Sequence, residues 1–232
     1  MVFPTSGVVT VFGEDPGKRS PKLLQDIFFV PEEIDTPDAN IISFAKSLSI
    51  FYPKFDLGQY KQLLDHLNVP NSNFKHLSFG QKKKTWIALG IASNTGLLIF
   101  DEPTNVLDIP SKQQFRKILA EHVDDERCLV ISTHQVKDLE NLIDNIIILD
   151  DGHILVNASV DTIAEELSFK RFTDKADLPV HIYSESNLFG AVAVIKSQPG
   201  EYNSHVDIEL FFNATIANKL LMKDIFNSKP CI

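Results

Sequence analysis

The sequence predicts an α/β protein built on a parallel, doubly wound sheet, with a helical subdomain and a small C-terminal α+β region. Three observations predict this class. Short apolar runs alternate with helix-length segments up to about Phe169, and apolar residues recur at helical spacing over residues 38–67. Beyond Phe169, short strand-like runs are separated by turn-rich stretches. We expect one domain over residues 1–169, with the helical subdomain at about 34–92, and a second over residues 170–232.

The strands predicted in the first domain are apolar runs that end at turn residues. They lie at residues 8–12, 27–30, 97–101, 128–132 and 145–149. Helices are predicted where good helix formers follow a capping residue, and they lie at about residues 78–92, 111–122 and 136–143. Asp150-Asp151-Gly152 is a strong hairpin signal into a further strand at residues 153–156.

The second domain is predicted to combine short strands with one helix. The strands lie at residues 180–183, 191–195 and 206–210, and the helix lies at about residues 215–226. Turn-rich stretches such as Ser197-Gln198-Pro199-Gly200 separate these elements.

The composition argues against several classes of protein. A formal net charge of −9 disfavours nucleic acid as a partner, because phosphate backbones are bound by clustered Lys and Arg, and Lys82-Lys83-Lys84 is the only dense basic run. Cys128 and Cys231 follow no disulfide or zinc spacing, which fits a reducing cytosol. No apolar run is long enough to span a bilayer and no signal peptide pattern is evident, so we expect a cytoplasmic protein whose membrane role runs through a partner.

The most informative segment is the apolar run of residues 97–100, which ends in Asp101 and Glu102. A buried parallel strand delivers such acids to the carboxyl edge of the sheet, where open α/β folds bind ligands. In a nucleotide hydrolase, Asp101 would hold Mg²⁺ and Glu102 would orient or deprotonate the attacking water. The same residues also suit a core strand that ends in a solvated acidic turn, so the neighbouring motifs must decide.

Three polar segments stand at the ends of predicted elements in a fixed order: Leu77-Ser78-Phe79-Gly80-Gln81, then Asp101-Glu102, then Thr133-His134. In this arrangement residues 1 to about 168 clearly resemble the ATPase domain of the ATP-binding cassette (ABC) family, whose signature loop, magnesium-binding strand and switch histidine follow this order. The resemblance implies a P-loop NTPase-like core that uses ATP and Mg²⁺.

The resemblance assigns the signature loop, Leu77 to Gln81, to the ATP bound by the opposite subunit. Ser78, Gly80 and Gln81 would meet its phosphates, since a helix N-terminus offers free N–H groups and the positive end of the helix dipole. Taken alone, the same residues are an ordinary helix cap. Phe79 departs from the family pattern, which usually has a second glycine at this position.

Further roles follow from the same resemblance. His134 matches the switch histidine, which senses the γ-phosphate and links it to Glu102, and both are therefore candidate catalytic residues. Asp108 matches an acid in the loop that communicates between two nucleotide sites, and it would also cap the helix that follows Pro110. Glu32 stands where the family usually has glutamine; it is either a variant ligand of Mg²⁺ beside Asp101 or a surface acid after a strand.

The phosphate-binding motif G-x-x-x-x-G-K-[ST] does not occur in the sequence. Residues 13–19 come nearest, but their glycines are one residue too close and two acids lie inside the loop. The resemblance places Met1 inside the helix that follows this motif in the family. We therefore expect an N-terminally truncated cassette domain that is inactive when isolated.

The function implied is that of the ATP-binding and ATP-hydrolysing subunit of an ABC transporter. It would pair with a second ATPase subunit, as a homodimer or heterodimer, and lie on the inner face of the membrane through a separate permease that docks on residues 34–64. Residues 206–214 are similar to tails of small bacterial exporter subunits. One alternative is a non-hydrolysing partner that lends its signature loop to a site in another subunit; another, a cassette ATPase of translation or DNA repair, is disfavoured by the acidic charge.

Overall fold

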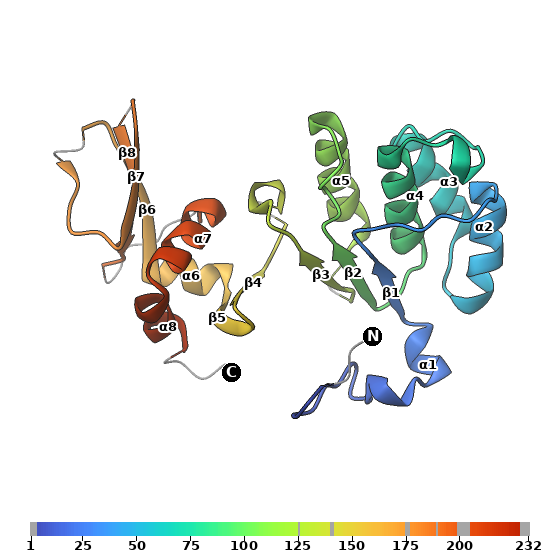
Figure 1. Ribbon diagram of the computed structural model, residues 1–232, viewed down its shortest axis with the longest axis horizontal. Helices are drawn as coiled ribbons and strands as arrows, with labels where there is room; N and C mark the ends of the chain where they lie inside the picture. Colours follow the sequence, from blue (N-terminus) through green and yellow to red (C-terminus); the bar gives the residue numbers. More distant parts are fainter. Residues whose placement is uncertain are drawn as a thin grey trace. The chain divides into compact units, whose positions relative to one another are not determined.

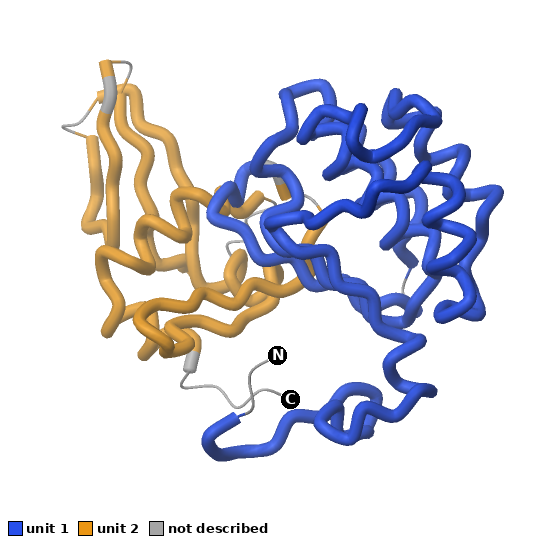
Figure 2. Tube along the Cα trace, turned by 45° about the vertical axis from the view of Figure 1, so that its right-hand side comes forward, with its two compact units in different colours: residues 1–138 blue, residues 139–232 orange. Residues whose placement is uncertain are grey.

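The structure is a computed structural model that describes residues 4–124, 126–139, 142–174, 177–188, 190–198 and 205–227 (Figure 1). The chain divides into an N-terminal unit, residues 1–138, and a C-terminal unit, residues 139–232 (Figure 2). Each unit has its own core. Over the described ranges, none of the helices has both the length and the apolar character needed to cross a bilayer.

A parallel sheet forms the centre of the N-terminal unit. Its strands are β1 (Ile27–Val30), β2 (Leu97–Asp101) and β3 (Cys128–Ser132), in the order β1-β2-β3. Both pairings are parallel and in register, so the strands end at one edge. The predicted parallel sheet is confirmed at these three strands.

Two helices pack on one face of this sheet (Figure 1). They are α4 (Phe79–Ala92) and α5 (Ile109–His122). Gly90 of α4 allows close approach, because a Cβ there would lie 3.0 Å from the Leu98 side chain. Phe100 stacks edge-on against Phe115 of α5, with ring centroids 5.8 Å apart. The two predicted helices are therefore confirmed.

The opposite face of the sheet is more open than a doubly wound fold predicts. Phe29 and Val130 point to this face, since they alternate with residues that contact α4 and α5. Their exposed fractions are 52% and 46%. Parallel sheets are normally covered on both faces, and among the described residues of the N-terminal unit no helix covers these two side chains.

The helical subdomain is built from three short segments. These are α2 (Ile41–Leu48), the 3₁₀ turn η2 (Ser49–Phe51) and α3 (Leu57–His66), of which α2 and α3 contact α4. Phe44 of α2 contacts Phe74 in the 3₁₀ turn η3 (Phe74–His76) and Trp86 of α4, with ring centroids 5.5 and 5.9 Å apart. Tyr60 and Leu63 of α3 are fully buried. The predicted helices over residues 38–67 are confirmed.

Two predicted elements of the N-terminal unit are wrong. Residues 8–12 form no strand: Phe12 and Gly13 have φ of 51° and 77°, and this turn leaves only one bridge, Val11 to Glu14. The 3₁₀ turn η1 (Pro16–Lys18) and the short helix α1 (Pro21–Leu24) follow. In place of a helix at 136–143, the described residues form the 3₁₀ turn η4 (Val136–Leu139), and residues 140 and 141 lie outside the described ranges.

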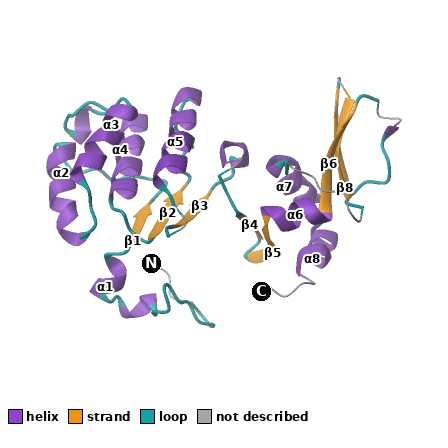
Figure 3. Ribbon diagram, turned by 180° about the vertical axis from the view of Figure 1, so that it is seen from behind, coloured by secondary structure: helices purple, strands orange, loops and turns teal. Residues whose placement is uncertain are grey.

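The described part of the C-terminal unit combines a hairpin and a three-stranded antiparallel sheet with helices (Figure 3). The hairpin joins β4 (Asn145–Asp150) to β5 (His153–Ser159) through Asp151 and Gly152, which have φ of 46° and 74° as a tight hairpin turn requires. The sheet has the order β6-β8-β7. Its strands and the helices of the unit are β6 (Leu167–Phe172), β7 (Tyr183–Asn187), β8 (Gly190–Lys196), α6 (Val160–Glu166), α7 (Ile208–Ala217) and α8 (Lys219–Asn227).

The strand predicted at residues 206–210 is wrong, because α7 begins there. Asp207 caps this helix by accepting a hydrogen bond from the Leu210 N–H at 2.9 Å. Ile208, Phe211 and Thr215 are buried at helical spacing. The helix predicted at 215–226 is interrupted between α7 and α8 at Asn218.

Along the chain, the boundary between the two compact units falls between Asp138 and Leu139, whereas the sequence predicts a domain change near residue 170. The β4–β5 hairpin accounts for the difference, because it packs with elements of the C-terminal unit. Helix α8 packs on β5, and Lys219 of α8 pairs with Asp150 at the hairpin turn. The extent of the ATPase-like domain over residues 1–169 stays a prediction.

Replacing Phe100 by alanine should lower the free energy of unfolding by about 3 to 5 kcal/mol, because Phe100 is fully buried between β2 and α5. The matched control is Phe29→Ala on the neighbouring strand, whose half-exposed ring should cost about 1 kcal/mol or less. Urea unfolding of both variants measures the difference. Equal losses would contradict the assignment of the two faces of the sheet.

Candidate active site

The site begins where β2 ends. Asp101 is the last residue of the strand, and its carboxylate accepts a hydrogen bond from the Ser132 hydroxyl of β3. Glu102 follows with φ of 42°, a left-handed conformation that is uncommon outside glycine. The Glu102 N–H donates to the Ser132 carbonyl at 2.9 Å, which turns the chain sharply away from the sheet.

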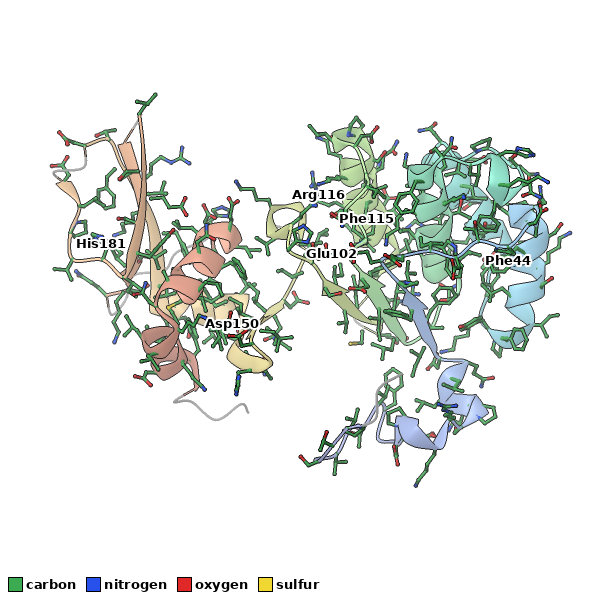
Figure 4. All side chains as sticks on the ribbon, in the orientation of Figure 1. Phe44, Glu102, Phe115, Arg116, Asp150 and His181 are labelled. Carbon is green, nitrogen blue, oxygen red and sulfur yellow. The ribbon has the colours of Figure 1, made fainter. Side chains whose placement is uncertain are left out.

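The Glu102 carboxylate is held by three donors. It accepts hydrogen bonds from the Thr133 hydroxyl at 3.0 Å, the His134 N–H at 2.9 Å and His134 Nδ1 at 2.7 Å. Since a carboxylate only accepts, Nδ1 carries the proton in this contact. Figure 4 shows Glu102 where β2 ends beside α5. The structure therefore brings the two predicted catalytic residues, Glu102 and His134, into direct contact.

A chain of hydrogen bonds connects Glu32 to the same carboxylate. The Asn105 amide donates to Glu32 Oε1 at 2.8 Å, and the Gln135 amide donates to Asn105 Oδ1 at 2.9 Å. The Gln135 N–H in turn donates to the Thr133 hydroxyl, which holds Glu102. The sequence gives no sign that Asn105 and Gln135 take part, because the connection exists only once three loops meet.

The predicted magnesium ligands, Asp101 and Glu32, lie at the ends of neighbouring strands. In the part of the chain that the structure describes, no three His, Cys, Asp or Glu side chains gather as a metal site. Mg²⁺ is commonly held by one or two carboxylates together with water and substrate phosphates, and the acid at the end of β2 fits that chemistry. Both ligand assignments stay predictions.

The signature loop forms the start of α4, as predicted. Ser78 accepts a hydrogen bond from the Gln81 N–H at 3.2 Å, and the Gln81 side chain accepts one from the Ser78 N–H at 2.9 Å. This reciprocal capping box occupies Oε1, the side-chain amide oxygen of Gln81. A Cβ on Gly80 would lie 3.5 Å from the Val106 carbonyl, an ordinary contact distance. Phe79 is 53% exposed, and all the nucleotide-binding roles predicted for this loop stay predictions.

A cleft of about 260 Å³ joins the signature loop to the ends of β1 and β2. It is lined by Glu32, Glu33, Phe79, Lys83, Glu102, Asn105 and Val106. Three glutamates face this cleft, so a triphosphate would enter it only together with a cation that offsets their charge.

Lys83 is a residue of the site that the sequence analysis missed. It belongs to the dense basic run Lys82-Lys83-Lys84, but Lys83 is only 1% exposed. Burial lowers the pKa of Lys83, while the charges of Glu32, Asp101 and Glu102 oppose that shift. The signal that could have found it is its spacing, because Lys83 lies one helical turn before the buried Ile87.

Asp108 caps α5, as predicted. Its carboxylate accepts a hydrogen bond from the Ser111 N–H at 2.9 Å, and Pro110 lies in the first turn of the helix. Hydrogen bonds from the Ser111 hydroxyl and N–H hold the pKa of Asp108 below its usual value. A role of Asp108 between two nucleotide sites stays a prediction.

The chain is similar to ATP-binding proteins of ABC transporters. It is 30% identical over 169 residues to the high-affinity zinc uptake system ATP-binding protein ZnuC of Bacillus subtilis. This match covers 66% of this chain and 71% of ZnuC. It is 25% identical over 171 residues to the ABC transporter ATP-binding protein YtrB of the same organism. This match covers 72% of this chain and 58% of YtrB. No protein-family model matches the chain.

The fold is shared with solved ATP-binding cassettes. A dimeric cassette bound to ADP and phosphate in a post-hydrolysis state superimposes with a TM-score of 0.59 at 21% identity, covering 68% of this chain and 75% of that one. The chain spans only 52 to 58% of the length of three of the curated relatives it matches.

The unfolding free energy difference between the wild type and Asp108→Asn should shrink as the pH falls. The pKa of Asp108 is lower in the folded state, so its charge stabilises the fold above about pH 4 and this contribution is lost as the pH falls through the lowered pKa. Asparagine is also a good helix cap, so the comparison isolates the charge. Urea unfolding at several pH values measures it; a difference that does not change with pH would contradict the assignment.

Proposed function

The chain belongs to the family of ABC transporter ATP-binding proteins, and on that basis we propose that it binds and hydrolyses ATP as a subunit of an ABC transporter. The observation that carries the proposal is the contact of Glu102 with Thr133 and His134 at the end of β2. These donors orient one carboxylate at a cleft that also receives the signature loop.

In this proposal Glu102 is the general base. Its carboxylate orients the attacking water and accepts its proton, and the three donors keep the carboxylate in one position through the reaction. The imidazole of His134 is 66% exposed in its contact with Glu102, so its ring can contact a phosphate while Nδ1 stays on Glu102. Asp101 would bind Mg²⁺, and the ion would neutralise part of the negative charge of the phosphates.

The partners proposed are a second ATPase subunit and a membrane permease. Ser78 and Gly80 offer a helix N-terminus to a nucleotide held by the second subunit. For the permease, the helical subdomain presents Ile50 and Phe51 at exposed fractions of 79% and 70%. Adjacent apolar side chains this exposed fit a docking contact, and they lie inside the segment that the sequence assigns to it. The chain would then act at the inner face of the membrane.

The direction of transport is a finer proposal. The similarity of residues 206–214 to exporter tails favours export. The printed names of two relatives, the zinc uptake protein ZnuC and the methionine import protein MetN of Carboxydothermus hydrogenoformans, are those of uptake systems. These names do not support export, so the proposal of export rests on the tail segment alone.

A second candidate function is a non-hydrolysing subunit that lends its signature loop to a nucleotide held elsewhere. It is favoured by the intact capping box at Ser78 and Gln81 in a sequence that contains no G-x-x-x-x-G-K-[ST]. The three hydrogen bonds on the Glu102 carboxylate favour hydrolysis instead, because a subunit that does not hydrolyse ATP needs no oriented base.

Replacing Glu102 by glutamine should reduce ATP turnover of the native complex by roughly 10²- to 10⁴-fold while ATP stays bound, because the amide cannot accept the proton. The complex is isolated from its source through a tag on this chain, and phosphate release is measured. The matched control is Glu33→Gln, which removes a carboxylate from the same cleft and should leave turnover near that of the wild type.

The same assay separates the two candidate functions. If Ser78→Arg abolishes turnover and Glu102→Gln leaves it unchanged, the chain is a non-hydrolysing subunit that contributes its signature loop, and the leading proposal is overturned. Loss of turnover in Glu102→Gln supports hydrolysis at its own site.

The variants Ile50→Ser and Phe51→Ser should weaken binding of the chain to inverted membrane vesicles from its source, because docking buries both side chains. Co-sedimentation measures the binding. Val8→Ser, which removes an apolar side chain that is 89% exposed elsewhere, is the control and should bind normally. Equal binding of all variants, or binding to protein-free lipid vesicles, would contradict docking on a permease.

A further inference from the structure

We propose that Lys83 is a positioning residue that couples the signature loop to the carboxylate of Glu102. The role of Glu102 rests on the proposed function, whereas the coupling rests on the geometry of α4. Lys83 lies one turn after Phe79, so its backbone moves with the signature loop. Its ammonium reaches the carboxyl ends of β1 and β2, where the candidate active site lies.

The Lys83 ammonium is shared among three backbone carbonyls. It donates to Pro31 at 2.9 Å and to Glu32 at 3.2 Å, just beyond β1, and to Asp101 at 3.1 Å, at the end of β2. An ammonium has three hydrogens, so these carbonyls use its full donor capacity. Lys83 itself is only 1% exposed, so its side chain is almost entirely enclosed by the protein.

The carbonyl of Asp101 belongs to the peptide group that precedes Glu102. The other polar group of this peptide is the Glu102 N–H, which donates to the Ser132 carbonyl of β3 at 2.9 Å. Lys83 from α4 and Ser132 from β3 therefore hold the same peptide from its two sides. This peptide precedes the φ of 42° at Glu102, a conformation that persists only where the surroundings enforce it.

A displacement of the signature loop must therefore reach Glu102. The three hydrogen bonds of Lys83 converge from two strands, and hydrogen bonds weaken steeply as they lengthen or bend. If the first turn of α4 shifts, the ammonium cannot stay on all three carbonyls. The peptide before Glu102 then loses one of its two restraints, and the carboxylate loses its fixed position.

The chemistry of the site requires a lysine-like group at this position. The charges of Glu32, Asp101 and Glu102 all favour a cation there. Methionine has a similar length, but it would leave the carbonyls of Pro31, Glu32 and Asp101 without this donor. Arginine keeps the charge, but its planar fork does not match donors that converge on one nitrogen.

Amide hydrogen exchange on the intact chain tests the coupling, with Lys83→Met compared to the wild type. We expect exchange of the Glu102 N–H to accelerate by roughly tenfold or more relative to that of Phe100 on the same strand, because a hydrogen bond from a charged donor is lost beside it. The imidazole Nδ1–H resonance of His134, which reports its contact with Glu102, should shift and broaden. Neither measurement depends on ATP turnover, so failure of this proposal is distinguishable from failure of the proposed function.

Lys84→Met is the matched control. Lys84 is the next residue of α4, and its ammonium also holds a backbone carbonyl, that of Leu67, at 3.2 Å. It should leave the exchange ratio of Glu102 to Phe100 and the His134 resonance unchanged. If Lys83→Met raises exchange equally at both amides, or leaves the His134 resonance in place, Lys83 acts on stability alone and the proposal is overturned.

A second measurement keeps the proposal testable if Lys83→Met does not fold. In the wild type, the ammonium of Lys83 should give a protected ¹H–¹⁵N signal at neutral pH, where exposed lysines exchange too fast to be seen, and Lys83→Arg assigns it by its loss. The signal should shift in Glu102→Gln and stay in place in Glu33→Gln. Absence of the signal, or equal responses to the two variants, would overturn the proposal.

Discussion

The parallel alignment of β1, β2 and β3 is the constraint on which the rest of the N-terminal unit depends. The register sets Val30 beside Phe100 and Asp101 beside Ser132, so the three strands end at one edge. Below this edge, apolar side chains are packed by α4 and α5. At the edge the backbone and the acids lose those neighbours, and every polar group there needs a partner. The candidate site consists of the partners that meet this need.

These partners are of two kinds. Lys83 supplies one buried cation to three backbone carbonyls, and its position on α4 ties the helical subdomain to the sheet. Thr133 and His134 supply the donors that hold Glu102. An acidic edge is tolerated because Lys83 offsets its charge and the hydrogen bonds from Thr133 and His134 stabilise the Glu102 carboxylate.

The features predicted correctly from the sequence are those that depend on neighbours along the chain. Ser78 and Asp108 cap the helices that follow them, as short-range hydrogen bonding dictates. Predictions that needed a distant partner were less secure. Residues 8–12 have the composition of a strand, but the structure shows only the bridge from Val11 to Glu14 there. Residues 206–210 also have the composition of a strand, but Asp207 caps a helix that begins within them.

By itself, the sequence determined the order of strands and helices around Asp101 and Glu102, and with it the family to which the chain belongs. Periodicity, caps and motifs are local, so they survive without knowledge of the fold. Only the tertiary structure decided that Lys83 is buried and that Glu32 is connected to Glu102 through Asn105 and Gln135. The physical reason is that both depend on strand ends that are distant in sequence and meet at one edge of the sheet.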